Sequence, residues 1–468
     1  MSLHTEHQPA EDRLLNFDEV LDAVPTYREF MTVEELDNSS KKLAEDFSEV
    51  TLEKIGESRE GRPISCLKIG TGDRNALLFA FPHPNEPIGS MTVEFLSKYL
   101  AENPDFTKKT GFTWHLIKVI DPDGAALNEG WFKGDFDPVK YAKHYYRPAS
   151  HEQMEWTFPI EYKKLKFTDS PPETRALMRI IDETKPDFMF SLHNAGFCGV
   201  YYYISHRIEE MFSGLVNLVK REKLPLHQGE PEAPYLKEFH PGIYQMFGIS
   251  ENYDFYEANG VENPQELILC GTSSDDYLKR VTSNRGFTLV CEMPYFYDRD
   301  LDDDSPTEED RRKLVLDSYD FFIEVHKYTK ERFNRFRNLC DPKSKIFSSV
   351  ADAIDNFEKR IAPQMHHAKT DSMYEGKATV AQAFDSKTAS RYYGAFRPAM
   401  TARLCDEAML IHPNQSKMLS EIKSELNEYV ESTVKRTLKG TNFEVIPIQK
   451  LVRVQVGSAL NCMEHLPS

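Results

Sequence analysis

The segment His83-Pro84-Asn85-Glu86 places a histidine and a glutamate two residues apart, directly after the apolar run 76–81. In a turn, both side chains of such a pair can reach one ion, and imidazole and carboxylate are ordinary zinc ligands. The spacing alone is weak evidence, because the chain has 15 histidines. Its position at the end of a predicted strand, among prolines and a glycine, favours a metal site.

A further histidine, His193, ends another apolar run in Phe190-Ser191-Leu192-His193. A lone histidine in such a place is more often a hydrogen-bonded structural residue. Two strand ends of one sheet can, however, bring it to His83 and Glu86, which would give three protein ligands and one open position. We therefore predict one Zn²⁺ ion held by His83, Glu86 and His193.

Glu292 ends a third apolar run, 287–291. A carboxylate at the end of a buried strand must be satisfied there, because unpaired burial is costly. Two interpretations stand: a glutamate that leaves the strand towards solvent, or a general base close to the metal. Such a base takes a proton from water and later delivers it to the leaving amine.

The elements that must position these residues alternate between strands and helices. The continuous apolar run 76–81 is typical of a strand buried on both faces, and 113–120 and 187–192 are also predicted to be strands. Helical spacing of apolar residues over 87–100 and 173–184 separates them. This order indicates an α/β fold, a largely parallel sheet with helices on both faces, in which ligands bind beyond the carboxyl ends of the strands.

We predict three parts of the chain: an acidic N-terminal lead-in over 1–50, a catalytic domain over 51–325, and a mainly helical C-terminal region over 326–468. The lead-in contains one amphipathic helix around 32–47. The stretch 125–172 reads as irregular and aromatic-rich, and so long a loop is often functional.

The sequence of the C-terminal region contains no recognisable catalytic or metal-binding motif. Its sequence predicts long helices over 308–339 and 414–439, and one or two strands within the apolar segment 443–456.

Composition narrows the class of protein. The chain has 468 residues and a formal net charge of −18, which disfavours binding to nucleic acid or to an anionic membrane surface. No apolar run approaches the length of a membrane span, and the N-terminus lacks the pattern of a secretory signal.

Seven cysteines, an odd number without a CxxC motif, are best explained as free buried thiols. We expect a cytoplasmic protein. Its oligomeric state is not predictable.

Four segments in this order resemble the zinc metallocarboxypeptidase family, the carboxypeptidase A-like enzymes: 55–64, 83–86, 191–193 and 287–292. The turn Asp121-Pro122-Asp123-Gly124 is similar to the family's Asn-Pro-Asp-Gly turn. The resemblance implies a mixed, mostly parallel eight-stranded sheet between helices, one zinc ion, and hydrolysis of a C-terminal peptide bond. It also implies that His83, Glu86 and His193 bind the metal and that Glu292 is the base.

The resemblance assigns two further residues to substrate binding. Arg147 falls where the family places a guanidinium that grips the substrate's terminal carboxylate, a role that suits its planar fork; the alternative is a surface ion pair. Asp275 aligns with the floor of the family's specificity pocket and would favour a cationic side chain. A structural carboxylate that caps a turn explains Asp275 equally well.

The chain departs from the family pattern at three places. Tyr146 stands where the family has asparagine before the arginine. The oxyanion-stabilising arginine has no counterpart, and Lys133, Lys140 and His144 are the candidates to replace it. The active-site tyrosine expected before residues 271–276 is missing. The alternatives are therefore a zinc amidohydrolase or deacylase acting on a non-standard amide, such as an N-acyl amino acid or a peptidoglycan-type peptide, or a non-catalytic binding protein.

Overall fold

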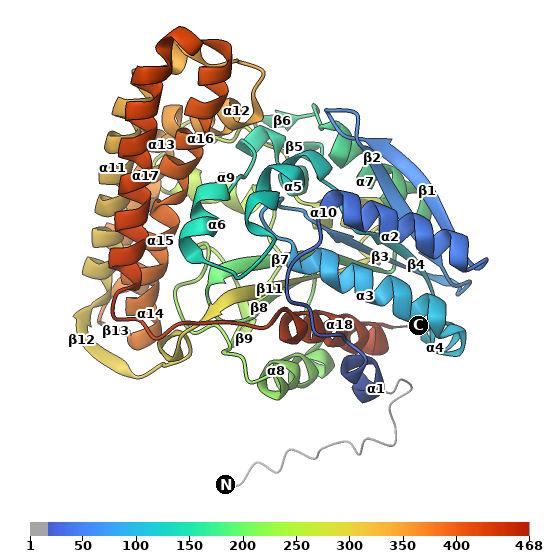
Figure 1. Cartoon of the computed structure of the whole chain (residues 1–468). Helices are drawn as coiled ribbons and strands as arrows, with labels where there is room; N and C mark the ends of the chain where they lie inside the picture. The colour runs from blue at the N-terminus through green and yellow to red at the C-terminus, as the bar shows by residue number, and fades with distance from the viewer. Residues whose placement is uncertain (1–16, 468) are drawn as a thin grey trace, which may run out of the picture.

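The computed structural model describes residues 17–467, so the first 16 residues of the predicted lead-in lie outside the described residues (Figure 1). Among residues 17–467 the largest element is a mixed sheet of ten strands. Its order is β1 (Val50–Glu57), β2 (Pro63–Ile69), β4 (Phe112–Ile117), β3 (Arg74–Ala80), β7 (Phe188–Phe197), β11 (Phe287–Tyr297), β8 (Tyr201–Ile204), β10 (Ile243–Gln245) and β9 (Glu238–His240), with β14 (Glu444–Val445) paired to β11.

The predicted mixed sheet between helices is confirmed, but it has ten strands instead of eight. The neighbours β4, β3, β7 and β11 run parallel to one another, as their apolar sequences predict. The ten include two short strands: β9 pairs with β10 at one edge of the sheet, and β14 pairs with the last two residues of β11.

Both faces of the sheet are covered, which explains the continuous apolar runs. Along β3, Ala76, Leu78 and Ala80 face one hydrophobic core, whereas Leu77 and Phe79 face a second core on the opposite side. The first core is closed by α1 (Phe17–Asp22), α2 (Val33–Asp46), α3 (Ile88–Glu102), α8 (Phe212–Arg221) and α18 (Ile448–His465). The second is closed by α7 (Pro172–Thr184) and α10 (Ser274–Thr282).

The predicted strands within 443–456 are largely wrong. Only Glu444–Val445 forms a strand, and Ile448–His465 is a helix that is buried along most of its length. A continuous apolar stretch does not distinguish a buried strand from a buried helix. Gln455 on α18 accepts a hydrogen bond from Thr92 and donates one to the carbonyl of His193, so the last helix of the chain belongs to the core of the sheet.

The remaining C-terminal helices form a bundle beside the edge at which β7 and β11 end (Figure 1). It consists of α11 (Arg311–Asn334), α12 (Lys345–Asp355), α13 (Phe357–Thr370), α15 (Ser390–Gly394), α16 (Phe396–Ile411) and α17 (Ser416–Leu438). The predicted long helices are confirmed as α11 and α17. Because α11 runs across residue 325, the predicted division there stays a prediction. No helix among residues 17–467 is long and apolar enough to cross a bilayer.

The stretch predicted to be irregular, 125–172, contains short elements. They include the end of α5 (Pro122–Asn128), which Asp121 caps, the helix α6 (Pro138–His144), and the hairpin of β5 (Ile160–Tyr162) and β6 (Leu165–Phe167). The helix α6 packs against α16 and α17, so this stretch connects the sheet to the bundle.

Candidate active site

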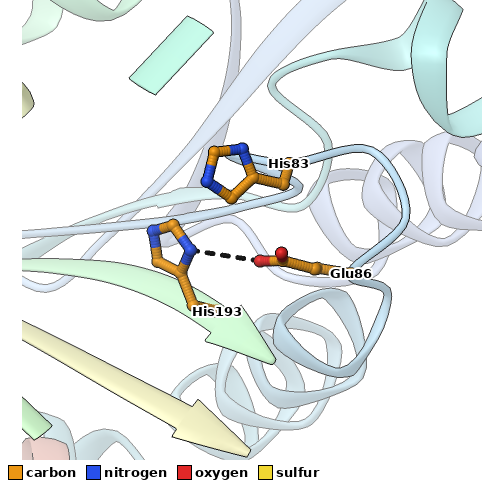
Figure 2. A group of neighbouring side chains, drawn as sticks. All are labelled: His83, Glu86 and His193. Atoms are coloured by element: carbon orange, nitrogen blue, oxygen red, sulfur yellow. Dashed lines mark ion pairs between the residues drawn. The ribbon is translucent and has the colours of Figure 1, made fainter. Parts of the chain in front are cut away.

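The three predicted metal ligands meet where β3 ends: His83 and Glu86 lie in the turn after this strand, and His193 lies within the neighbouring β7 (Figure 2). One possible ligand atom of each of His83, Glu86 and His193 lies within 4.8 Å of the others, and all three residues are buried. The chain leaves β3 through Phe81, which is buried and has a φ of 59°. An aromatic residue in this left-handed region is a strained outlier, and such strain is common at functional turns.

The buried Nδ1 atoms of the two histidines are suited to bind a cation. Nδ1 of His83 and Nδ1 of His193 are buried and make no hydrogen bond, although Nδ1 of His193 lies 3.1 Å from a carboxylate oxygen of Glu86. Buried polar atoms without partners are rare in folded proteins. Burial, and then the nearby Arg147, hold the pKa of His83 well below its ordinary value, which keeps its imidazole in the neutral form that binds metal.

A hydrogen-bonded chain fixes the tautomer of His193. Oγ of Ser191 lies 2.9 Å from Nε2 of His193 and donates to the carboxylate of Glu155 at 3.0 Å. A hydroxyl has one hydrogen to donate, so Ser191 accepts the N–H of Nε2 and leaves Nδ1 of His193 with a free lone pair. Glu155 is in turn held by the backbone N–H and the hydroxyl of Ser274. Partners of this kind orient the ligands of a metal.

Strand register brings Glu292 to the metal ligands. Glu292 on β11 is paired directly with His193 on β7, and its carboxylate lies 3.6 Å from Nδ1 of that histidine. The pKa of Glu292 is raised by burial and by the neighbouring Glu86 carboxylate. Glu292 is buried at this position and does not extend from the strand into solvent.

Comparison with known proteins agrees with this geometry. Residues 36–261 match the family model described as zinc carboxypeptidase. The predicted family is confirmed over these residues. The match and the metal triad identify a zinc metallopeptidase, and the predicted cofactor, one zinc ion, is confirmed with them. The search of curated proteins gives no significant match.

Solved structures of carboxypeptidases resemble the chain weakly. The carboxypeptidase A of Helicoverpa armigera is 16% identical, with a TM-score of 0.39, and the alignment covers 60% of this chain and 71% of that one. The metallo-carboxypeptidase of Burkholderia cenocepacia is 16% identical with a TM-score of 0.34, covering 56% of this chain and 60% of that one. Bovine thrombin-activatable fibrinolysis inhibitor, in complex with tick carboxypeptidase inhibitor, is 12% identical, with a TM-score of 0.34 and coverages of 56% and 86%.

Arg147 lies in the cleft of this metallopeptidase and not on its outer surface. It lines a cavity of about 300 Å³ together with the metal triad and Glu292, which we call the metal-site cavity. Its guanidinium donates to a carboxylate oxygen of Glu86 at 3.3 Å and to Gln153 at 3.3 Å. The preceding Tyr146 is fully buried, and its hydroxyl has no partner, so it supplies no second donor to the cavity.

The geometry of Asp275 favours the structural alternative. Asp275 does not line the metal-site cavity, is 1% exposed, and accepts from Ser205 at 2.6 Å while it pairs with Lys279 at 2.6 Å. The carboxylate points from α10 into the protein, where each of its oxygens has a partner, and its assignment to substrate binding stays a prediction. Lys133, Lys140 and His144 also lie outside the lining of this cavity.

The C-terminal bundle contributes residues that sequence reasoning did not find. Tyr393 on α15 and Phe396 on α16 line the metal-site cavity. The phenol oxygen of Tyr393 accepts the backbone N–H of Gly196 at 3.1 Å, which leaves its own O–H free to donate. Glu232 also lines the cavity and accepts from the hydroxyl of Tyr203 at 2.8 Å. No motif marks these residues, and the irregular π-helical turn at Asp385–Ala389 before α15 is visible only in the structure.

Proposed function

We propose that the protein is a zinc carboxypeptidase that removes a C-terminal residue by hydrolysis of its peptide bond. The single observation that carries the proposal is the placement of Glu292 and Arg147 in one cavity with His83, Glu86 and His193. A base beside the metal and a guanidinium within the same cleft are what hydrolysis next to a terminal carboxylate requires.

When bound by the two histidines and Glu86, zinc supplies a Lewis acid that polarises a carbonyl and acidifies water. The carboxylate of Glu292 accepts a proton from the attacking water. As the C–N bond breaks, Glu292 returns this proton to the leaving amine, so that it begins and ends the cycle as a carboxylate. Raising the pKa of Glu292 by burial suits both steps, because the group must hold the proton between them.

Arg147 orients the substrate in this proposal. Its fork can pair bidentately with the terminal carboxylate, which places the last peptide bond, and no internal one, beside the metal ligands. In the structure the guanidinium is held between Glu86 and Gln153, so its position is set before substrate arrives.

The test compares matched peptides on the zinc-loaded protein. Peptides with a free C-terminal carboxylate should be hydrolysed, and the same peptides with a C-terminal amide should be spared. Glu292→Gln should abolish turnover while zinc content stays at one ion per chain. Activity that survives in this variant would overturn the mechanism.

A second candidate function is a zinc amidohydrolase or deacylase. The observation that favours it is the burial of Tyr146, because the carboxylate is then left with one guanidinium, Arg147, among the described residues of the cavity lining. Equal hydrolysis of free and amidated peptides, or hydrolysis of N-acyl amino acids alone, would support this function over a carboxypeptidase.

We also propose that the protein works in the cytoplasm. All seven cysteines of the chain are free, and six of them are buried. A reducing compartment preserves such thiols. Enzyme activity in cell fractions tests this assignment.

A further inference from the structure

A second cavity adjoins the metal-site cavity, and its charge has the opposite sign. Its volume is about 510 Å³, and its charged lining consists of three arginines, Arg147, Arg360 and Arg397, and one acid, Asp352. We call it the arginine cavity. The two cavities meet, because Arg147, Tyr145, Tyr393 and Phe396 line both of them. In the metal-site cavity, by contrast, four glutamates accompany one arginine.

Arg397 is the one arginine of the three without a partner. Among residues 17–467 its guanidinium makes no hydrogen bond or ion pair, and it lies over the ring of Phe357, whose centroid is 5.0 Å away. Arg397 is half-buried, and its five N–H donors stay available to a ligand that enters the cavity. Burial, and then the neighbouring Arg360, lower the pKa of Arg397 to about 10.

Arg360, in contrast, is already paired. Its guanidinium donates to both carboxylate oxygens of Asp352, at 3.1 and 3.2 Å, and to the hydroxyl of Ser150 at 3.1 Å. Asp352 makes its hydrogen bonds to Arg360 and none to Arg397, although its charge acts on both. The free positive charge of the cavity lies on Arg397, with Arg360 reinforcing the positive potential around it.

The helices α15 and α16 place Arg397 close in sequence to a residue of the metal-site cavity. Tyr393 and Arg397 are four residues apart along α15 and α16, and the linking Ala395 is itself helical, so both side chains lie on one helix face. Tyr393 lines both cavities, and Arg397 lines the arginine cavity only. A ligand that is held at Arg147 can therefore extend along this face to Arg397.

We propose that the arginine cavity binds a second carboxylate of the substrate, so that the residue released is a dicarboxylic one such as glutamate or aspartate. The inference rests on the proposed carboxypeptidase function and names its substrate class. Arg397 pairs with the side-chain carboxylate while Arg147 holds the terminal one. Pairing of this kind is strong and directional, because the planar fork matches the two oxygens of a carboxylate.

The experiment compares benzoyl-glycyl-glutamate with benzoyl-glycyl-glutamine, which have nearly the same shape and differ in the charge of one side chain. On the zinc-loaded protein we expect kcat/KM to be at least about tenfold higher for the glutamate peptide, as one charge-assisted pair provides. Arg397→Gln should remove this preference and change kcat/KM for the glutamine peptide by less than about twofold. Arg397→Lys should retain part of it.

The control is Arg436→Gln, which removes an equal charge from an exposed position on α17 that lines neither cavity. This substitution should leave kcat/KM unchanged for both peptides. Arg397→Gln should unfold at or above the wild-type temperature, because it removes an unpaired charge. An equal loss of kcat/KM on both peptides, or no preference in the wild type, would overturn the proposal that the arginine cavity binds a second carboxylate, which we call the anion site.

A binding measurement separates this proposal from the proposed function. Calorimetry with the same two peptides reports the charge preference even if neither peptide is cleaved. Absent cleavage with a charge preference that Arg397→Gln removes would reject the carboxypeptidase function and keep the anion site. Cleavage of both peptides without such a preference would keep the function and reject the anion site.

Discussion

The metal-bearing edge of the sheet and the C-terminal bundle line one cleft, but they are encoded in different ways. At the sheet edge His83 and Glu86 follow a strand, and strand pairing places Glu292 on β11 beside His193 on β7. In the bundle, Tyr393 and Arg397 reach the cleft because whole helices pack beside it. An apolar strand and the polar residue at its end can be recognised from a short stretch of sequence, whereas the position of a packed helix cannot. The metal ligands and Glu292 therefore lie in recognisable sequence motifs, whereas Tyr393 and Arg397, which we assign to substrate selection, do not.

The largest expected effect is at the sheet edge. Glu292→Gln should lower kcat by about 100- to 10,000-fold, the contribution of a positioned general base, and zinc content should not change. Turnover of a free-acid peptide and metal analysis of the same sample measure the two quantities. The control Glu45→Gln removes an exposed carboxylate and should keep full activity. If zinc is lost together with activity, Glu292 acts by holding the metal and not as a base.

The next effect tests whether α18 belongs with the sheet and not with the bundle. Leu460 is fully buried in the core that α3 and α8 share, so Leu460→Ala should lower the free energy of unfolding by about 2–5 kcal/mol. Urea unfolding measures this loss. Leu410→Ala, at a position on α16 that is 86% exposed, should change the free energy by less than about 0.5 kcal/mol. Equal effects of the two substitutions would contradict the packing of α18.

A smaller effect is expected from the residues behind the metal ligands. Glu155→Gln weakens the acceptor that holds Ser191 and thereby His193, so zinc affinity should fall by about 10- to 100-fold. Competition with a chelator of known affinity measures this change. Glu161→Gln changes an exposed glutamate nearby in the sequence and should leave zinc affinity unaltered. An unchanged affinity in Glu155→Gln would mean that the strand alone orients His193.

The smallest effect is expected from the bundle. Tyr393→Phe keeps the ring and removes one hydroxyl, so it should lower kcat/KM by about three- to tenfold if that hydroxyl donates to substrate, as a single neutral hydrogen bond does. The loss should be the same for the glutamate and glutamine peptides, which separates Tyr393 from Arg397. A loss confined to the glutamate peptide would instead place Tyr393 within the anion site.

The sequence by itself determined the metal-site residues that come at the ends of its apolar runs. His83, Glu86, His193 and Glu292 were predictable because an apolar run fixes a buried strand, and the carboxyl ends of parallel strands share one edge of the sheet. The long helices α11 and α17 were also predictable, α11 as a long charged segment and α17 from an apolar stripe at helical spacing.

Only the tertiary structure decided the rest. The apolar segment that forms α18 carries no period that separates helix from strand, and its burial between α3 and α8 selects the helix. Asp275 matched a pocket position by alignment, yet Ser205 and Lys279 bind its carboxylate inside the protein. The alignment of Asp275 pointed towards a cationic substrate side chain, and a net charge of −18 would attract such substrates. The unpaired Arg397 in the cleft favours an anionic substrate instead. The field around a bound group depends on which nearby charges lack partners, and the net charge of the sequence does not contain this information.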